Sequence, residues 1–252
     1  MTGDVVRQVV LIRVGVDTGA GGIHSPLFAD GSFEYIPIPD RFGSTNGVDS
    51  RTYGTALGKK REPLINYFPT RLRSKCKDQS IHFDPEFESF TYGDPSTLKS
   101  RLKTLKENDL LVLYAGLEGW DFHCDPALYI IGFFSVSCAG LPDQLGEKFG
   151  STKWREHFAK NFHVRHSVVF EDQRDRLVLV KGDQTKSRLL NKAVQISEVG
   201  KDRTGRAIHV LSPDMQEVFG YFDGHISINR SPPRWVLPTF ADKAAEFVSA
   251  LQ

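Results

Sequence analysis

The chain has 252 residues, of which 40% are hydrophobic and 25% are charged, a composition typical of soluble globular proteins. This length accommodates one large or two small domains. The formal charge of +1 arises from 32 basic and 31 acidic residues, so no overall electrostatic field directs the protein to nucleic acid or to a membrane.

The cysteines and the N-terminal sequence indicate a reducing compartment. The three cysteines, Cys76, Cys124 and Cys138, are odd in number and widely separated, which argues against a disulfide framework or a structural zinc site. The N-terminal residues show no secretory signal, and no apolar window reaches the roughly 18 residues of a membrane span. We therefore expect a cytoplasmic protein with no membrane partner.

The first predicted element is a buried strand at residues 5–14, which is short, β-branched and bounded by glycine. It leads into a glycine-rich loop, and clustered glycines indicate backbone with positive φ or close neighbours. If the protein is an enzyme, we predict Asp17 as general base, His24 as proton carrier and Arg13 as an orienting or charge-stabilising group. The alternative role of Asp17 is an Asx turn within the loop. We predict that three loop glycines contact a nucleotide: Gly19, Gly21 and Gly22.

Two known phosphate-binding motifs do not fit this loop. A P-loop needs a lysine followed by Ser or Thr, and a dinucleotide fingerprint needs a third small residue where this chain has His24. The segment 16–20, Val-Asp-Thr-Gly-Ala, imitates the loop of aspartic peptidases, which require two aspartates sharing a proton. With one Asp-Thr-Gly the chain would have to dimerise, so a peptidase is the least favoured alternative.

A second strand is predicted at Ser32 to Ile38, followed by a long loop at residues 41–61. Local charge is then uneven. Residues 51–77 contain eight Lys or Arg and one acid, whereas residues 78–94 contain five acids and no Lys or Arg. Such blocks are solvated faces or, where basic blocks converge, a surface for a polyanion.

The next predicted elements are a helix at Thr97 to Glu107 and two apolar strands, Leu110 to Tyr114 and Leu128 to Val136. Strands that are almost entirely apolar are covered on both faces, so we expect this hairpin at the centre of a sheet or barrel. The hairpin is similar to the barrel strands of PUA-like base-binding domains (the EVE, YTH and ASCH group). That resemblance implies that Tyr114 lies at the floor of a base pocket.

Later elements suggest a second set of ligand contacts. We predict strands at 164–170 and 176–180, and a short helix from Thr185 or Ser187 to Leu190 whose N-terminus would bind an anion. The phosphate-binding candidates are Arg165, Lys181, Lys186 and Arg188. His157, His163 and His166 suggest a metal, but the chain is predicted to change here from a helix within 142–162 to the strand at 164–170. No common face is then guaranteed, so no metal ligand is predicted.

The C-terminal part completes a single unit. Weaker strands are predicted at 203–210 and 218–222, and an amphipathic helix at Phe240 to Leu251. Between them, Arg234 and Trp235 could close a pocket by stacking on a base. No repeat or linker divides the chain. We therefore predict one α+β domain over residues 1–252, with a mixed β-sheet or partly closed barrel flanked by a few helices.

Four segments resemble one known family. They are the block from Arg13 to Ile23, the block from Pro26 to Pro39, His82-x-Asp84-Pro-x-Phe with Tyr92-Gly-Asp94, and the closing Arg230-x-Pro-Pro-Arg-Trp235. Together they are similar to the third family of nucleotide-modification-associated domains. This resemblance implies a component of a DNA base or nucleotide modification system, whose partner is a nucleotide or nucleic acid.

Two functions from different classes follow from this resemblance. The protein binds a nucleotide or modified base in a cleft beside the glycine-rich loop and acts on it, or it is a non-catalytic reader of modified bases in DNA. A catalyst should lose turnover and keep ligand affinity in Asp17→Asn, whereas a reader should lose affinity. The sequence identifies no cofactor and leaves the oligomeric state open.

Overall fold

Two long apolar strands form the centre of the fold. The structure is a computed structural model that describes residues 7–18, 23–40, 42, 51–222, 224–228 and 232–251. Strands β6 (Leu110–Gly119) and β7 (Ala127–Gly140) pair in antiparallel fashion, and nearly all their residues are buried. The predicted hairpin is confirmed. Burial of each large apolar side chain stabilises it by roughly 1.5–3 kcal/mol, which makes the hairpin the core of the sheet.

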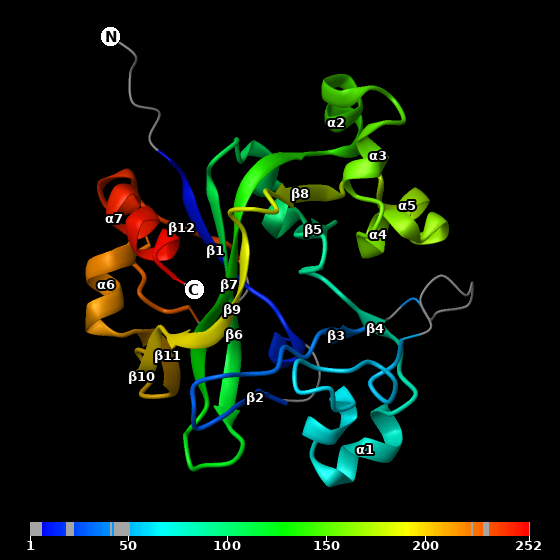
Figure 1. Cartoon of the computed structure of the whole chain (residues 1–252). Helices are drawn as coiled ribbons and strands as arrows, with labels where there is room; N and C mark the ends of the chain where they lie inside the picture. Colours follow the sequence, from blue (N-terminus) through cyan, green and yellow to red (C-terminus); the bar gives the residue numbers. More distant parts are fainter. Residues whose placement is uncertain are drawn as a thin grey trace.

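The hairpin belongs to a mixed eight-stranded sheet in the described part of the chain (Figure 1). The strand order is β12-β1-β6-β7-β8-β5, with β2 paired to β6 and β9 paired to β7. Strands β1 and β2 run parallel to β6, and the other pairs are antiparallel. The bounds are β1 Val9–Arg13, β2 Ser25–Leu27, β5 Thr91–Asp94, β8 Val178–Gly182, β9 Arg188–Gln195 and β12 Arg234–Trp235. The fold is α+β as predicted, with an open sheet instead of a closed barrel.

Helices and two small sheets surround the central hairpin (Figure 1). Helix α7 (Pro238–Ser249) packs against β1 and α6 (Pro213–Phe219), and it buries Ala244 and Val248 as its apolar period predicts. Figure 1 shows α2 (Pro142–Phe149), α3 (Trp154–His157), α4 (Phe162–Arg165) and α5 (Ser167–Gln173) gathered near the end of β8. No helix in the described ranges is long and apolar enough to cross a membrane.

The remaining elements lie outside the eight-stranded sheet. The two-stranded sheet of β3 (Ile38–Pro39) and β4 (Ile81–His82) joins η1 (Val16–Thr18), η2 (Leu64–Tyr67) and α1 (Thr70–Cys76) around a separate apolar cluster. The short helix η3 (Thr97–Thr104) packs against β7 and β8, and β10 (Ser197–Lys201) pairs with β11 (Ala207–Leu211). This arrangement brings β4, β5 and α4 to one region next to the end of β1.

Four local predictions are wrong. The segment 164–170 is helical in α4 and α5, and the predicted helix from Thr185 to Leu190 is replaced by β9. Of the strand predicted from Ser32 to Ile38 only Ile38 lies in a strand, β3, and the strand predicted at 218–222 is replaced by the end of helix α6 and the residues that follow it. The helix predicted from Thr97 forms as the 3-10 helix η3. Runs such as Val168-Val169-Phe170 have the composition of strands, but here tertiary packing overrides the local preference.

Candidate functional site

A small cavity lies where β1, β3, β4, β5, η3, α4 and α5 approach one another. Its volume is about 230 Å³. Its wall combines the end of β1 with buried polar groups and one lysine. The lining residues used below are Arg13, Gly15, Ile38, His82, Asp84, Tyr92, Gly93, Asp94, Lys99, His163 and Gln173.

Three buried side chains that bind metals in other proteins meet in this wall. His82, Asp84 and His163 each offer one ligand atom, and these atoms lie within 4.8 Å of one another. The carboxylate Oδ2 of Asp84 is 3.6 Å from Nε2 of His163. The three side chains therefore form a buried cluster of two imidazoles and one carboxylate, and this set could hold a cation.

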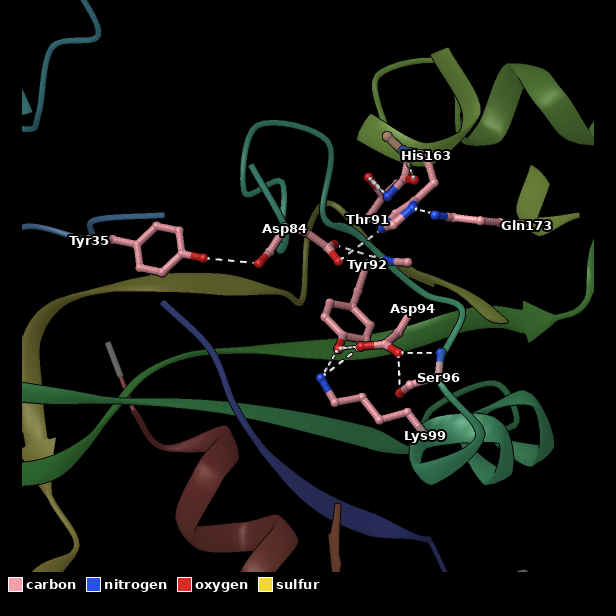
Figure 2. Close-up of polar contacts among 11 residues, drawn as sticks. Tyr35, Asp84, Thr91, Tyr92, Asp94, Ser96, Lys99, His163 and Gln173 are labelled. Atoms are coloured by element: carbon pink, nitrogen blue, oxygen red, sulfur yellow. Dashed lines mark hydrogen bonds and ion pairs between the residues drawn. The ribbon is translucent and has the colours of Figure 1, made fainter. Parts of the chain in front are cut away.

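Neighbouring elements hold each member of the cluster in place. His82 lies on β4 and its ring stacks on Phe162 at a centroid distance of 3.7 Å. Asp84 accepts a hydrogen bond from the backbone N–H of Gly93 at 2.9 Å. The carboxylate is thus fixed by strand β5, and Figure 2 shows it directed toward His163.

The orientation of His163 is fixed by hydrogen bonds of both its backbone and its ring. Its backbone N–H donates to Oδ1 of Asn161, the N-cap of α4, at 3.1 Å. Its ring atom Nδ1 lies 2.7 Å from Oε1 of Gln173 on α5, as Figure 2 shows. A carbonyl oxygen only accepts hydrogen bonds, so Nδ1 carries a proton and Nε2 is the ring nitrogen that faces Asp84.

A second polar group in the cavity centres on Lys99. Its ammonium lies 2.8 Å from Oδ2 of Asp94 and 2.6 Å from the hydroxyl of Tyr92. Asp94 also accepts hydrogen bonds from the backbone N–H and the hydroxyl of Ser96, the N-cap residue of η3 (Figure 2). Burial raises the pKa of Asp94, but Lys99 and Ser96 lower it by more, so the carboxylate stays charged at neutral pH.

Burial also shifts the pKa values of the clustered groups. It lowers the pKa of His82 well below its usual value, and the neighbouring His163 lowers it further. His82 is therefore neutral at neutral pH, with a lone pair available. Burial raises the pKa of Asp84, and its contacts with His163 and the N–H of Gly93 oppose that change.

The predicted catalytic residues form a neighbouring group around the end of β1. The guanidinium of Arg13 contacts Oδ2 of Asp17 through Nε at 2.9 Å and Nη2 at 2.6 Å. The N–H of Gly116 donates to the same oxygen at 2.9 Å. Burial raises the pKa of Asp17, whereas the charge of Arg13 and its hydrogen bond oppose this.

The structure distributes these residues over two cavities. Arg13 lines the cavity of His82, Asp84 and His163, and Asp17 is bound to Arg13 behind it. His24 lines a different cavity of about 400 Å³, and its Nδ1 is 3.5 Å from a carboxylate oxygen of Glu118. The loop glycines Gly19, Gly21 and Gly22, like Arg230, lie outside the described residues.

Three other residues predicted to contact the nucleotide pack within the protein. Tyr114 is fully buried, and its hydroxyl donates to the carbonyl of Ile228. Trp235 on β12 is partly buried beneath the guanidinium of Arg101. Arg234 is the other residue of β12 and is also partly buried.

The predicted phosphate-binding residues are not joined by a helix in this structure. Lys181, Lys186 and Arg188 donate to the carbonyl of Ser89, the side chain of Asn108 and the carbonyls of Thr185 and Ser187 respectively. The predicted helix at 185–190 does not form, so the prediction of an anion site at its N-terminus is wrong. Arg165 is the last residue of α4, the same short helix that carries His163. Binding of phosphate by these four side chains stays a prediction.

Sequence reasoning assigned no role to His82, Asp84, Lys99 or Gln173. His82-x-Asp84 was part of the family resemblance, and this alternating spacing was the available signal. His163 was considered as a metal ligand together with His157 and His166, which do not belong to the cluster. Its partners come from β4 and its adjoining loop, a relation that no local pattern encodes.

Comparison with known proteins identifies one family. The family model described as nucleotide modification associated domain 3 matches residues 8–250, nearly the entire chain. No curated protein and no solved structure matches this chain. The resemblance to PUA-like barrels is not confirmed.

Proposed function

Because the chain belongs to the nucleotide modification associated domain 3 family, we propose that it binds a nucleotide or modified base in the cavity of His82, Asp84 and His163. The family name supports a role in nucleotide modification. Our proposal adds that the ligand binds in this cavity and that any reaction takes place there.

One observation carries this proposal. Three of the four segments that resemble the family line the same cavity. The block from Arg13 to Ile23 contributes Arg13 and Gly15, the block from Pro26 to Pro39 contributes Ile38, and the third segment contributes His82, Asp84 and residues 92–94. A cavity built from all three is where a shared ligand would be recognised.

The size and polarity of the cavity favour a small ligand. Typical ligand pockets measure about 300–1,000 Å³, so a cavity of about 230 Å³ fits a base or part of a nucleotide better than a polymer. Arg13 and Lys99 supply positive charge, while the hydroxyl of Tyr92 and the carboxylates supply hydrogen-bonding groups. Such groups read the edge of a base that has been taken out of its stack.

If the protein is an enzyme, the catalytic roles predicted from the sequence divide between two positions. Arg13 reaches the cavity and can orient an anionic group of the ligand. Asp17 holds Arg13 through its carboxylate, so it can influence the ligand through that guanidinium or act as a base itself. His24 lines another cavity but lies close to Asp17, because a Cβ atom at Gly116 would contact both side chains, so it would serve as proton carrier through Asp17 or for a ligand that extends to it.

The test is a binding titration with a variant that fills the cavity. Ile38 on β3 lines the cavity and is partly buried, so Ile38→Trp places an indole at its wall. Leu57→Trp is the control because Leu57 is exposed and does not line this cavity. The ligands are the four deoxynucleoside monophosphates, their base-substituted derivatives, and a DNA duplex that carries the same substituted bases.

We expect wild type and Leu57→Trp to bind one or more monophosphates with equal affinity in calorimetry, and Ile38→Trp to lose at least tenfold. Equal binding by all three proteins would place the ligand elsewhere, and absence of binding would reject the proposal. Preference for the duplex, with affinity that falls steeply as salt is raised, would support the reader of modified DNA.

A further inference from the structure

The cluster of His82, Asp84 and His163 has the composition of a transition-metal site. Two imidazole nitrogens and one carboxylate oxygen are the ligands of many zinc sites and of the facial triad that holds non-haem iron. All three residues are buried, and no more than 9% of each is exposed. We propose that they bind one divalent transition-metal cation, with its open coordination position facing the cavity.

Two buried nitrogen atoms in the described structure have no hydrogen-bond partner and belong to this cluster. They are Nε2 of His82 and Nε2 of His163. A buried polar atom without a partner costs about 1–3 kcal/mol, and such atoms are rare in native proteins. A cation bound within the cluster would give these two nitrogens a partner.

The hydrogen bond between His163 and Gln173 leaves the other ring nitrogen of His163 for a cation. Nδ1 donates to the carbonyl of Gln173, and this tautomer directs the lone pair of Nε2 toward the carboxylate of Asp84. Nε2 and Oδ2 of Asp84 are 3.6 Å apart, which is longer than a hydrogen bond. A cation between these two atoms would bind both of them.

The spacing fits metal coordination. A zinc ion about 2.0–2.2 Å from each of two ligands in tetrahedral geometry holds those ligands about 3.4 Å apart. The distance of 3.6 Å between His163 and Asp84 is already close to this value. The ligand atom of His82 lies within 4.8 Å of the other two and would move closer to them when the cation binds.

Gln173 and Gly93 act as the outer shell of the proposed site. Histidine ligands in metalloproteins usually donate their second N–H to a carbonyl or carboxylate, which fixes the tautomer. Gln173 makes this contact with His163, and the N–H of Gly93 holds the other oxygen of Asp84. The ligand set contains nitrogen, which favours zinc or iron(II) over magnesium or calcium.

Metal binding is measured on the protein alone, so the test does not require the nucleotide to be identified. Purified full-length protein is stripped with a chelator and then titrated with Zn²⁺, anaerobic Fe²⁺, Co²⁺ or Mg²⁺ in calorimetry. Bound metal is counted by elemental analysis, and the visible absorption of Co²⁺ reports its ligands. We expect one Zn²⁺ or Fe²⁺ per chain, and a raised melting temperature with either.

Asp84→Asn is the decisive variant because it should fold. The amide oxygen keeps the bond to Gly93, and the amide nitrogen can donate to the lone pair of His163, so melting without metal should be unchanged. Metal affinity should fall by more than 100-fold. In Gln173→Leu the metal affinity should fall by about 10–100-fold, as is usual when a residue that holds a metal ligand is changed. Gln173→Glu should restore the affinity.

His166→Asn is the matched control. His166 is as buried as His82 and contacts the same Phe162 ring, but it is not part of the cluster. This variant should bind metal like the wild type. Absence of stoichiometric binding, a preference for Mg²⁺, or equal affinity in wild type and Asp84→Asn would each overturn the proposal.

Discussion

Replacement of Gly116 by alanine tests whether the group of Arg13 and Asp17 is held as rigidly as its contacts indicate. A Cβ atom at this position would meet Oδ2 of Asp17 at less than the closest distance real Cβ atoms show, and Cδ2 of His24 at 2.9 Å. The Asp17 side chain is 2% exposed and fixed by three hydrogen bonds, so it cannot simply turn toward solvent.

The expected cost combines two effects of similar size. Forcing a methyl group into a packed site costs about 1–3 kcal/mol, and displacing a charge-assisted hydrogen bond costs about 1.5–3 kcal/mol. Loss of glycine freedom in the unfolded chain offsets about 0.4–1 kcal/mol of this. We therefore expect Gly116→Ala to lower the free energy of unfolding by about 2–5 kcal/mol, measured by urea denaturation.

The control for this substitution is Gly146→Ala. Gly146 lies inside helix α2, where a Cβ would meet its nearest atom at 3.7 Å. Removing a glycine from a helix interior should stabilise the protein by about 0.5–1 kcal/mol. In the Asp17→Ala background the obstructing carboxylate is absent, so Gly116→Ala should cost much less there. An equal cost in both backgrounds would refute the reasoning.

Three further substitutions test neighbouring contacts. Burial raises the pKa of Glu86 from 4.5 to about 7, so the folded state binds this proton more tightly than the unfolded state. The free energy of unfolding therefore falls as the pH rises from about 5 to about 7. Glu86→Gln should remove up to about 3 kcal/mol of that decrease, and identical pH dependence in urea titrations would contradict this. Gly93→Ala places a methyl group 2.7 Å from Cδ2 of His163, so it should cost about 1–3 kcal/mol in urea denaturation and weaken nucleotide binding in calorimetry; unchanged stability and affinity would argue against the site. Lys99→Met leaves the Asp94 carboxylate without its cation and should cost about 3–5 kcal/mol in urea denaturation, part of which Asp94→Asn should restore; an additive double variant would show that the pair is not coupled.

The sequence determined the centre of the fold. Near-continuous apolar runs such as Leu110 to Tyr114 can only be buried on both faces, whatever surrounds them, so β6 and β7 were predictable as central strands. The spacing of Ala244 and Val248 likewise predicted the buried face of α7. In these elements the local pattern and the tertiary structure demand the same conformation.

The sequence also singled out Arg13 and Asp17, whose side chains lie in contact at the end of β1, and their catalytic roles stay predictions. It failed where packing decides the conformation. The segment 167–173 has the β-branched and aromatic composition of a strand, but it forms α5 and buries Val169 and Phe170.

The cluster of His82, Asp84 and His163 was decided by the tertiary structure alone. Its members come from β4, the loop after it and α4, and they meet because β5 pairs with β8 and fixes Asp84 through Gly93. Sequence spacing reports neighbours along one helix or strand, whereas this cluster depends on the path of the chain between its elements. That path is set by the burial of the apolar strands, and it positions the polar side chains beside them.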